Sequence, residues 1–219
     1  YDYISRCAEE DMNISLPPQD LRIWLFHSLR ASSAVMIHSG AVVDVDKLEA
    51  YLGNYSALLK YFMPDITLGM KDVTAYSTIY SETCHELAHA SHFTKVGTGY
   101  WNKYIRYILE SYIKTGGQMY GDGNSEYAGY CEVGECWAYY LESMMYKERY
   151  GGSIPTFGTG YWFYPQVFRY LDERGLSRSD IFSVLGENVM SMDAVRTVLT
   201  ETFPEKRTII DQVFERYVN

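Results

Sequence analysis

Apolar residues recur at three- and four-residue steps along most of the chain, which is the spacing of helices that bury one face. This pattern predicts helices over residues 20–40, 44–62, 78–94, 100–114 and 127–150. Glycines end several of these segments, and the stretch from Gly97 to Gly99 separates the third from the fourth. Three or four further helices are expected after residue 151, where Ser177 and Asp180 form a capping-box pattern and Pro204 marks another helix start.

The one convincing strand runs from Asp65 to Met70, directly upstream of the helix predicted over 78–94. Residues 1–20 contain two adjacent prolines and show no clear period, so we expect them to form an N-terminal arm. A chain of 219 residues can bury one good core, and a single domain is expected. The predicted fold class is mainly α (α+β), a helical domain with a small sheet beside one helix, and residues 151–219 form its C-terminal helical part.

Charge and hydropathy narrow the classes of partner. The net charge is −9 at pH 7, whereas nucleic-acid binding needs a basic surface, so no nucleic-acid partner is expected. The longest apolar stretch, Ala31 to Val43, is shorter than the roughly 20 residues of a membrane helix and carries polar side chains, so no membrane span is predicted. The sequence begins with Tyr1 rather than Met, and we therefore expect an upstream segment or domain in a longer or processed chain.

The cysteines and tyrosines bear on metal chemistry and location. Cys7, Cys84, Cys131 and Cys136 lack the CxxC spacing of a zinc ribbon, and we expect them to be buried as small apolar residues. The chain contains 22 tyrosines, and such a high tyrosine content is common in secreted proteins that contact carbohydrates or peptides. They favour an extracellular or cell-envelope location.

The segment from His85 to His89 reads His-Glu-Leu-Ala-His, an HExxH pattern inside a predicted helix. Histidines four residues apart lie one turn apart on the same helical face, so both imidazoles can reach one cation. Glu86 is then placed to take a proton from a metal-bound water. Such a match arises by chance about 1 time in 100 in a chain of this composition, which disfavours two unrelated histidines.

A hydrolytic zinc site needs three protein ligands and one open position for water. His92 lies seven residues after His85, about 10 Å along the helix axis, too far to share an ion with both His85 and His89. We expect His92 to support the ligands or contact the substrate, with a plain surface role as the alternative. The third ligand is expected to be a carboxylate, and Glu132 and Glu135 are both candidates because they share one face of the helix predicted over 127–150.

An HExxH helix followed by a helix that carries a glutamate resembles the gluzincin arrangement of zincin metallopeptidases. The second helix of such proteins often reads Glu, small residue, aromatic, Ala, acid, aromatic, and the segment 135–140, Glu-Cys-Trp-Ala-Tyr-Tyr, is similar. The resemblance covers roughly residues 65–150 and implies a zincin-like fold with a metallopeptidase core there. It also implies one Zn²⁺ held by His85, His89 and Glu135, with Glu86 as the general base and later the acid.

The chain departs from this family pattern at Tyr139, which stands where thermolysin-like members have an acid that orients a zinc histidine. The Tyr139 hydroxyl is expected to bond an imidazole or to stabilise an oxyanion, and His92 and Glu132 are further candidates for such supporting roles. The gap from His89 to Glu135 also exceeds the thermolysin spacing.

The resemblance further implies that the strand from Asp65 to Met70 is an edge strand. Its central residues would pair with an extended peptide through main-chain hydrogen bonds. These residues are Ile66, Thr67, Leu68 and Gly69.

The function expected from these residues is zinc-dependent hydrolysis of a peptide or protein substrate. The alternative is a catalytically inactive zincin-like binding module at a cell surface that retains the metal. The missing acid at Tyr139 favours the inactive module, whereas the intact Glu86 favours the enzyme. A metal-free helical domain is the remaining possibility.

Overall fold

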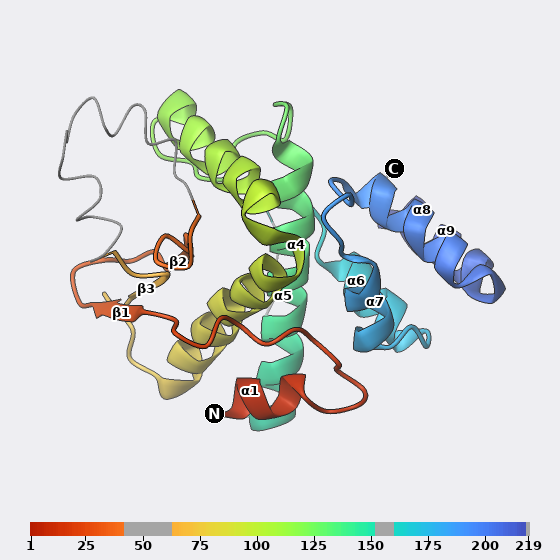
Figure 1. Cartoon of the computed structure of the whole chain (residues 1–219), viewed down its shortest axis with the longest axis horizontal. Coiled ribbons are helices and arrows are strands. Elements are labelled where there is room, and N and C mark those ends of the chain that lie inside the picture. The colour runs from red at the N-terminus through yellow and green to blue at the C-terminus, as the bar shows by residue number, and fades with distance from the viewer. Residues whose placement is uncertain (42–62, 152–159, 218–219) are drawn as a thin grey trace.

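The computed structural model describes residues 1–41, 63–151 and 160–217 (Figure 1). Within these ranges it contains seven α-helices and one three-stranded sheet, which confirms a mainly helical chain with a small sheet. The helices are α1 (Asp2–Cys7), α4 (Tyr76–Thr115), α5 (Ala128–Tyr150), α6 (Gln166–Glu173), α7 (Arg178–Val184), α8 (Met192–Thr202) and α9 (Arg207–Tyr217), with a short 3₁₀ helix η2 (Pro204–Lys206). The strands are β1 (Ile23–Phe26), β2 (Ser33–Ala34) and β3 (Ile66–Gly69). The helix predicted over 44–62 lies outside the described residues.

Helix α4 is bent at Gly97, where φ is 75° and ψ is 176°. A side chain added at Gly97 would meet nothing within 4 Å, so the positive φ is what favours glycine there. The break predicted between Gly97 and Gly99 is thus confirmed as a kink within α4. Its first half, residues 76–96, carries the HExxH pattern, and its second half, residues 98–115, leaves at a steep angle (Figure 1).

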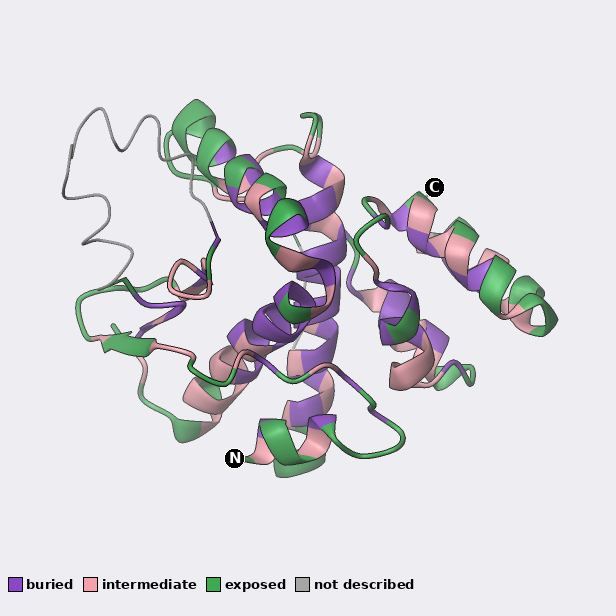
Figure 2. Ribbon diagram, viewed as in Figure 1, coloured by how far each residue is buried: buried purple, intermediate pink, exposed green. Residues whose placement is uncertain are grey.

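Helix α5 lies between two clusters of buried side chains. One cluster surrounds Trp137 and joins α5 to α1 and to helices α6 to α9. The other surrounds Trp101 and joins the sheet, the kinked α4 and the beginning of α5. The facing sides of the first half of α4 and of α5 are buried almost continuously (Figure 2). The α4–α5 pair therefore forms the buried centre against which the rest of the described chain packs.

The strand order is β1-β3-β2, so β3 is the central strand and not an edge. Strand β1 runs parallel to β3, with Ile23 opposite Ile66, and β2 runs antiparallel to it, with Ala34 opposite Ile66. The strand predicted from Asp65 to Met70 is confirmed, but the edge position expected for Ile66 to Gly69 is wrong because both sides of β3 are paired. Among the described strands, β2 and β1 form the two edges.

The helix predicted over residues 20–40 is also wrong, because this segment supplies β1 and β2. Its apolar residues fit a helical spacing, but Ile23 to Phe26 is also a continuous apolar run that suits a strand. The pairing partner, β3, lies about 40 residues downstream, so local spacing could not reveal it.

The N-terminal arm contains a helix that was not predicted, α1, whose six residues are too few to show a period. Tyr3 of α1 is buried, and its hydroxyl is hydrogen-bonded at 2.7 Å to the hydroxyl of Ser91 on α4. The arm is thus packed against the helix that carries the HExxH pattern.

Other local predictions are confirmed. Ser177 and Asp180 form a capping box at the start of α7, and Pro204 begins η2 directly before α9. All four cysteines are buried and free of disulfides. No described helix is both long enough and apolar enough to cross a membrane.

Candidate metal centre

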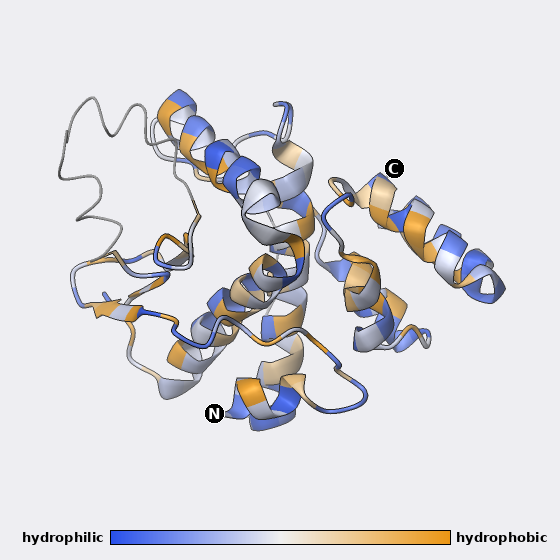
Figure 3. Cartoon of the chain, viewed as in Figure 1, coloured by the Kyte–Doolittle hydropathy of each residue, from blue (hydrophilic) through white to orange (hydrophobic). Residues whose placement is uncertain are grey.

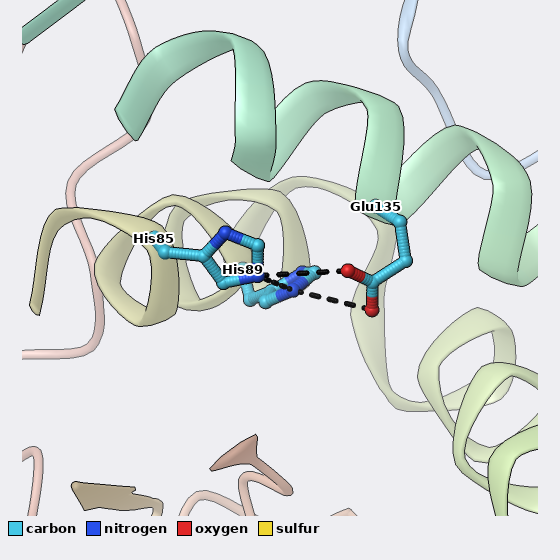
Figure 4. A group of neighbouring side chains, drawn as sticks. All are labelled: His85, His89 and Glu135. Atoms are coloured by element: carbon cyan, nitrogen blue, oxygen red, sulfur yellow. Dashed lines mark hydrogen bonds and ion pairs between the residues drawn. The ribbon is translucent and has the colours of Figure 1, made fainter. Parts of the chain in front are cut away.

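Three side chains from two helices converge on one point: His85 and His89 from the first half of α4, and Glu135 from α5 (Figure 4). The two Nε2 atoms are 3.2 Å apart. Glu135 places Oε2 at 3.5 Å from Nε2 of His85 and Oε1 at 3.5 Å from Nε2 of His89. Two ligand atoms bound tetrahedrally to one zinc ion would lie about 3.3 Å apart. The group can therefore hold a metal ion with little movement.

The hydrogen bonding of His85 is also compatible with a bound cation. Its Nδ1 lies 3.1 Å from Oε2 of Glu142, an arrangement in which the ring N–H donates to the carboxylate. A neutral His85 then presents the lone pair of Nε2 to His89 and Glu135, and Oε2 of Glu135 has no hydrogen-bond partner. A bound cation would take the place of the Nε2 proton and accept these lone pairs. Two imidazoles and one carboxylate are a donor set that zinc uses in catalytic sites.

Electrostatics in the metal-free protein couple the three groups. Burial alone would lower the pKa of His85, but the carboxylates of Glu135 and Glu142 outweigh it and hold that pKa above its ordinary value. Burial alone would raise the pKa of Glu135, but His89 and His85 hold it below its ordinary value. Burial lowers the pKa of His89. A proton on His85 thus balances Glu135 when no cation is bound, and metal binding must displace it.

Glu86 stands beside this group without joining it. Its side chain is buried, its Oε2 has no hydrogen-bond partner, and it lines the cavities next to the ligands. Burial raises the pKa of Glu86 to about 8. A buried carboxyl group without a hydrogen-bond partner is costly, which makes Glu86 a candidate for a functional role.

Two supporting side chains were not predicted from the sequence. Glu142, which contacts Nδ1 of His85, follows Glu135 by seven residues and so lies on the same face of α5 two turns later. That spacing was a signal that could have identified Glu142. Tyr104, on the second half of α4, donates its hydroxyl to Oε1 of Glu135 at 2.5 Å. Only the kink at Gly97 brings Tyr104 back to the site, and no local pattern indicates this.

Glu142 therefore places a carboxylate against His85, whereas position 139 has no acid. Tyr139 contacts His85 through its ring, edge-to-face, with ring centroids 4.5 Å apart. Its ring also packs on that of Tyr161, with ring centroids 5.9 Å apart. Tyr139 thus packs against a ligand but forms no hydrogen bond with that imidazole.

Glu132 points away from the metal centre. Its Oε2 accepts a hydrogen bond from the backbone N–H of Met192, at the start of α8, at 3.2 Å. The structure therefore groups Glu135, and not Glu132, with the two histidines.

His92 is fully buried, so the alternative of a surface role is wrong. Its ring packs edge-to-face on Tyr100 at 5.2 Å, and neither ring nitrogen has a hydrogen-bond partner among the described residues. Burial lowers the pKa of His92 to about 3, which keeps the ring neutral. It lines neither cavity at the site, and nothing in its contacts supports a role in binding substrate.

Two adjoining cavities, of about 120 and 380 Å³, open beside the metal centre. The lining that they share includes Ser32, His85, Glu86 and Tyr120, so together they form one continuous cleft. The wall opposite the helices is the segment of residues 30–35, which includes β2.

Ser32 fixes this wall to the rest of the protein. Its hydroxyl donates to Glu82 on α4 at 2.9 Å and accepts from the backbone N–H of Gly69 at 3.1 Å. A side chain at Gly69 would come within 2.6 Å of the carbonyl oxygen of Ala31, so only glycine allows this approach. Neither Ser32 nor this close approach was predicted from the sequence.

Comparisons of the chain with protein-family models, with curated proteins and with solved structures found no match. The function of the centre therefore has to be inferred from its own residues and their geometry.

Proposed function

We propose that the protein is a zinc-dependent metallopeptidase of the gluzincin type with a zincin-like fold. The observation that carries this proposal is the convergence of His85, His89 and Glu135 beside a buried, unpartnered Glu86 at an open cleft. Three protein ligands leave one coordination position for water, which is the requirement of a hydrolytic zinc site.

Each residue has a chemical task in this proposal. Bound zinc would supply Lewis acidity to the scissile carbonyl and to its water. Glu86 accepts the proton of that water and later passes it to the leaving nitrogen. In the metal-free protein burial raises the pKa of Glu86 to about 8, and a bound cation would lower it and so favour the carboxylate that accepts the proton. Glu142 orients His85 through Nδ1, and Tyr104 orients Glu135.

The peptide-binding strand in this proposal is β2, since β3 is central in the sheet. Residues 32–35 line the smaller cavity beside Glu86 and His89. No described strand pairs with the side of β2 that faces away from β3. An extended peptide that adds to this side would bring its main chain past the metal centre.

Tyr120 is the best-placed donor to the oxyanion of the tetrahedral intermediate. It lines both cavities together with Glu86, whereas Tyr139 lines only the larger one. Burial, together with the nearby carboxylate of Glu135, raises the pKa of Tyr120, so its hydroxyl keeps the proton that it would donate.

The alternative of an inactive, metal-retaining module at a cell surface rested on the missing acid at position 139. Glu142 provides a carboxylate to His85 from the next turn of α5. That removes the specific reason for preferring the inactive module. An extracellular or cell-envelope enzyme remains the proposal that the residues favour.

The test is to measure the zinc content of the purified protein and its cleavage of a mixed peptide library, for wild type and Glu86→Gln. We expect about one zinc per chain in both proteins and a rate about 100- to 10,000-fold lower in the variant. Equal turnover by the two proteins would overturn the role of Glu86, and the absence of bound zinc from the wild type would overturn the metal centre.

A further inference from the structure

The two halves of the cleft differ in chemistry. Apart from the ligands and Glu86, the smaller cavity has no charged lining residue. Its remaining walls consist mostly of apolar side chains, those of Ala34, Val35, Ile105, Ile108, Leu109 and Met119. Its volume is about 120 Å³, and a bound ion with its water would take part of this space because all three ligands line it. The rest of the lining favours an apolar side chain beside the metal.

The larger cavity, of about 380 Å³, is lined by two further carboxylates, Glu82 and Glu142. Glu82 accepts a hydrogen bond from Ser32, and Glu142 contacts the imidazole of His85. In the described chain no lysine or arginine forms an ion pair with either carboxylate. The one cationic residue of the lining, Arg30, is paired with Asp72 at 3.1 Å and is largely exposed. This half of the cleft therefore favours a positively charged group.

Glu86 lies where the two halves of the cleft meet, because it lines both cavities. The peptide bond that is cleaved must lie beside Glu86, because Glu86 acts on the attacking water. The side chains before and after that bond therefore enter cavities of different character.

We propose that the preferred substrate is a peptide with an apolar side chain on the N-terminal side of the cleaved bond and a lysine or arginine on its C-terminal side. This inference rests on the proposed peptidase function. The direction of the bound peptide follows from the chain around β2. Along this segment, residues 30–32 line the larger cavity and residues 32–35 line the smaller one. Antiparallel pairing, the more stable arrangement per residue, makes the substrate run from the apolar half to the acidic half.

The test uses the zinc-loaded protein and four peptides of equal length that differ only in two central residues, Leu-Lys, Leu-Glu, Ser-Lys and Lys-Leu. We expect kcat/KM for Leu-Lys to exceed that for Ser-Lys by at least about 10-fold, since an apolar pocket discriminates strongly. The advantage over Leu-Glu should be about 3- to 5-fold, because the carboxylates are partly solvated. Cleavage should occur between the two varied residues. Equal rates, or a preference for Lys-Leu, would overturn the proposal.

Matched variants assign each preference to one half of the cleft. Glu82→Gln keeps an acceptor for Ser32 but removes the charge, so it should reduce the advantage of Leu-Lys over Leu-Glu. Glu173→Gln, at an exposed position that ends α6, should leave that advantage unchanged.

In the smaller cavity, Leu109→Gln should reduce the advantage of Leu-Lys over Ser-Lys. Ile113→Gln, one turn later on α4 and largely exposed, should not. A variant pair with equal effects would overturn the assignment.

Failure of this inference can be distinguished from failure of the proposed function. If the zinc-loaded protein cleaves neither these peptides nor the mixed peptide library, hydrolysis itself is wrong. Binding of the same fluorescently labelled peptides to zinc-loaded Glu86→Gln then tests recognition alone. The same ranking of affinities would support the asymmetric cleft, and equal affinities would overturn it.

Discussion

The two walls of the cleft are built in different ways. One wall is the helix pair formed by the first half of α4 and by α5, where His85, His89 and Glu135 are buried and supported by Tyr104 and Glu142. The other wall is the segment of residues 30–35, which contains a two-residue strand and depends on hydrogen bonds from β3 and on Ser32. Figure 2 shows the contrast, with buried residues concentrated where the helix pair meets and exposed residues along β1.

Under the proposed function, this difference predicts that one wall binds the metal and the other binds the substrate. A metal site needs ligands held within a fraction of an ångström, and two closely packed helices provide this. Substrate recognition tolerates a wall with few buried contacts, which is free to adjust when a peptide is added. The neighbouring strand β1 is also apolar yet exposed (Figures 2 and 3). Changes in the helix pair should therefore alter metal content, and changes in the 30–35 wall should alter kinetics alone.

The largest effect is expected from Glu135→Ala, which removes one of the three grouped ligands. Zinc content should fall from about one per chain to near zero. Glu132→Ala should retain zinc, because Glu132 contacts the backbone of Met192 and not the metal centre. Metal analysis of the two folded variants checks this. Loss of zinc only from Glu132→Ala would show that the helix pair does not position ligands as described.

Glu142→Gln tests how the helix pair supports one of the histidines. The amide oxygen can still accept a hydrogen bond from Nδ1 of His85, but the negative charge is lost. We expect zinc affinity to fall about 10- to 100-fold, as is typical when the partner of a metal-bound histidine is changed. Competition with a chelator measures this, with Glu173→Gln as the control. An unchanged affinity would mean that Glu142 does not support His85.

In the metal-free protein, the burial of Glu86 is expected to lower the free energy of unfolding at high pH. Its pKa is raised from 4.5 to about 8 by burial, so between these values the folded protein binds more protons than the unfolded one. Stability of the metal-free protein should therefore fall as pH rises through this window. Glu86→Gln removes this cost and should stabilise the metal-free protein at pH 8 by at least about 1 kcal/mol, with little gain near pH 4.5. Urea unfolding at the two pH values checks this, and a gain independent of pH would contradict it.

The smallest effect is expected from the opposite wall. Ser32→Ala removes the hydroxyl that joins Glu82 to Gly69, which loosens residues 30–35 without touching a ligand. Zinc affinity should stay unchanged, while kcat/KM should fall about 3- to 10-fold, mainly through KM. Loss of zinc from Ser32→Ala would break the proposed separation between a wall that binds metal and a wall that binds substrate.

The helices that carry the candidate site could be predicted from the sequence because their signals are local. The HExxH spacing puts His85 and His89 on one face, and Gly97 breaks the pattern where α4 bends. The helix predicted over 127–150 also agrees with α5 to within one residue. In each case the relevant residues lie within a few turns of one another, so periodicity and glycine suffice.

Tertiary structure decided what these signals left open. Helical spacing placed Glu132 and Glu135 on one face, and the resemblance favoured Glu135. The contact between α4 and α5 groups Glu135 with the histidines, which spacing alone could not do because a face does not say which turn meets the partner helix. The same contact assigns Glu142 to His85, and the bend in α4 returns Tyr104 to Glu135. The order of the sheet required pairing between strands about 40 residues apart, and such long-range pairing leaves no local periodic signal from which to predict it.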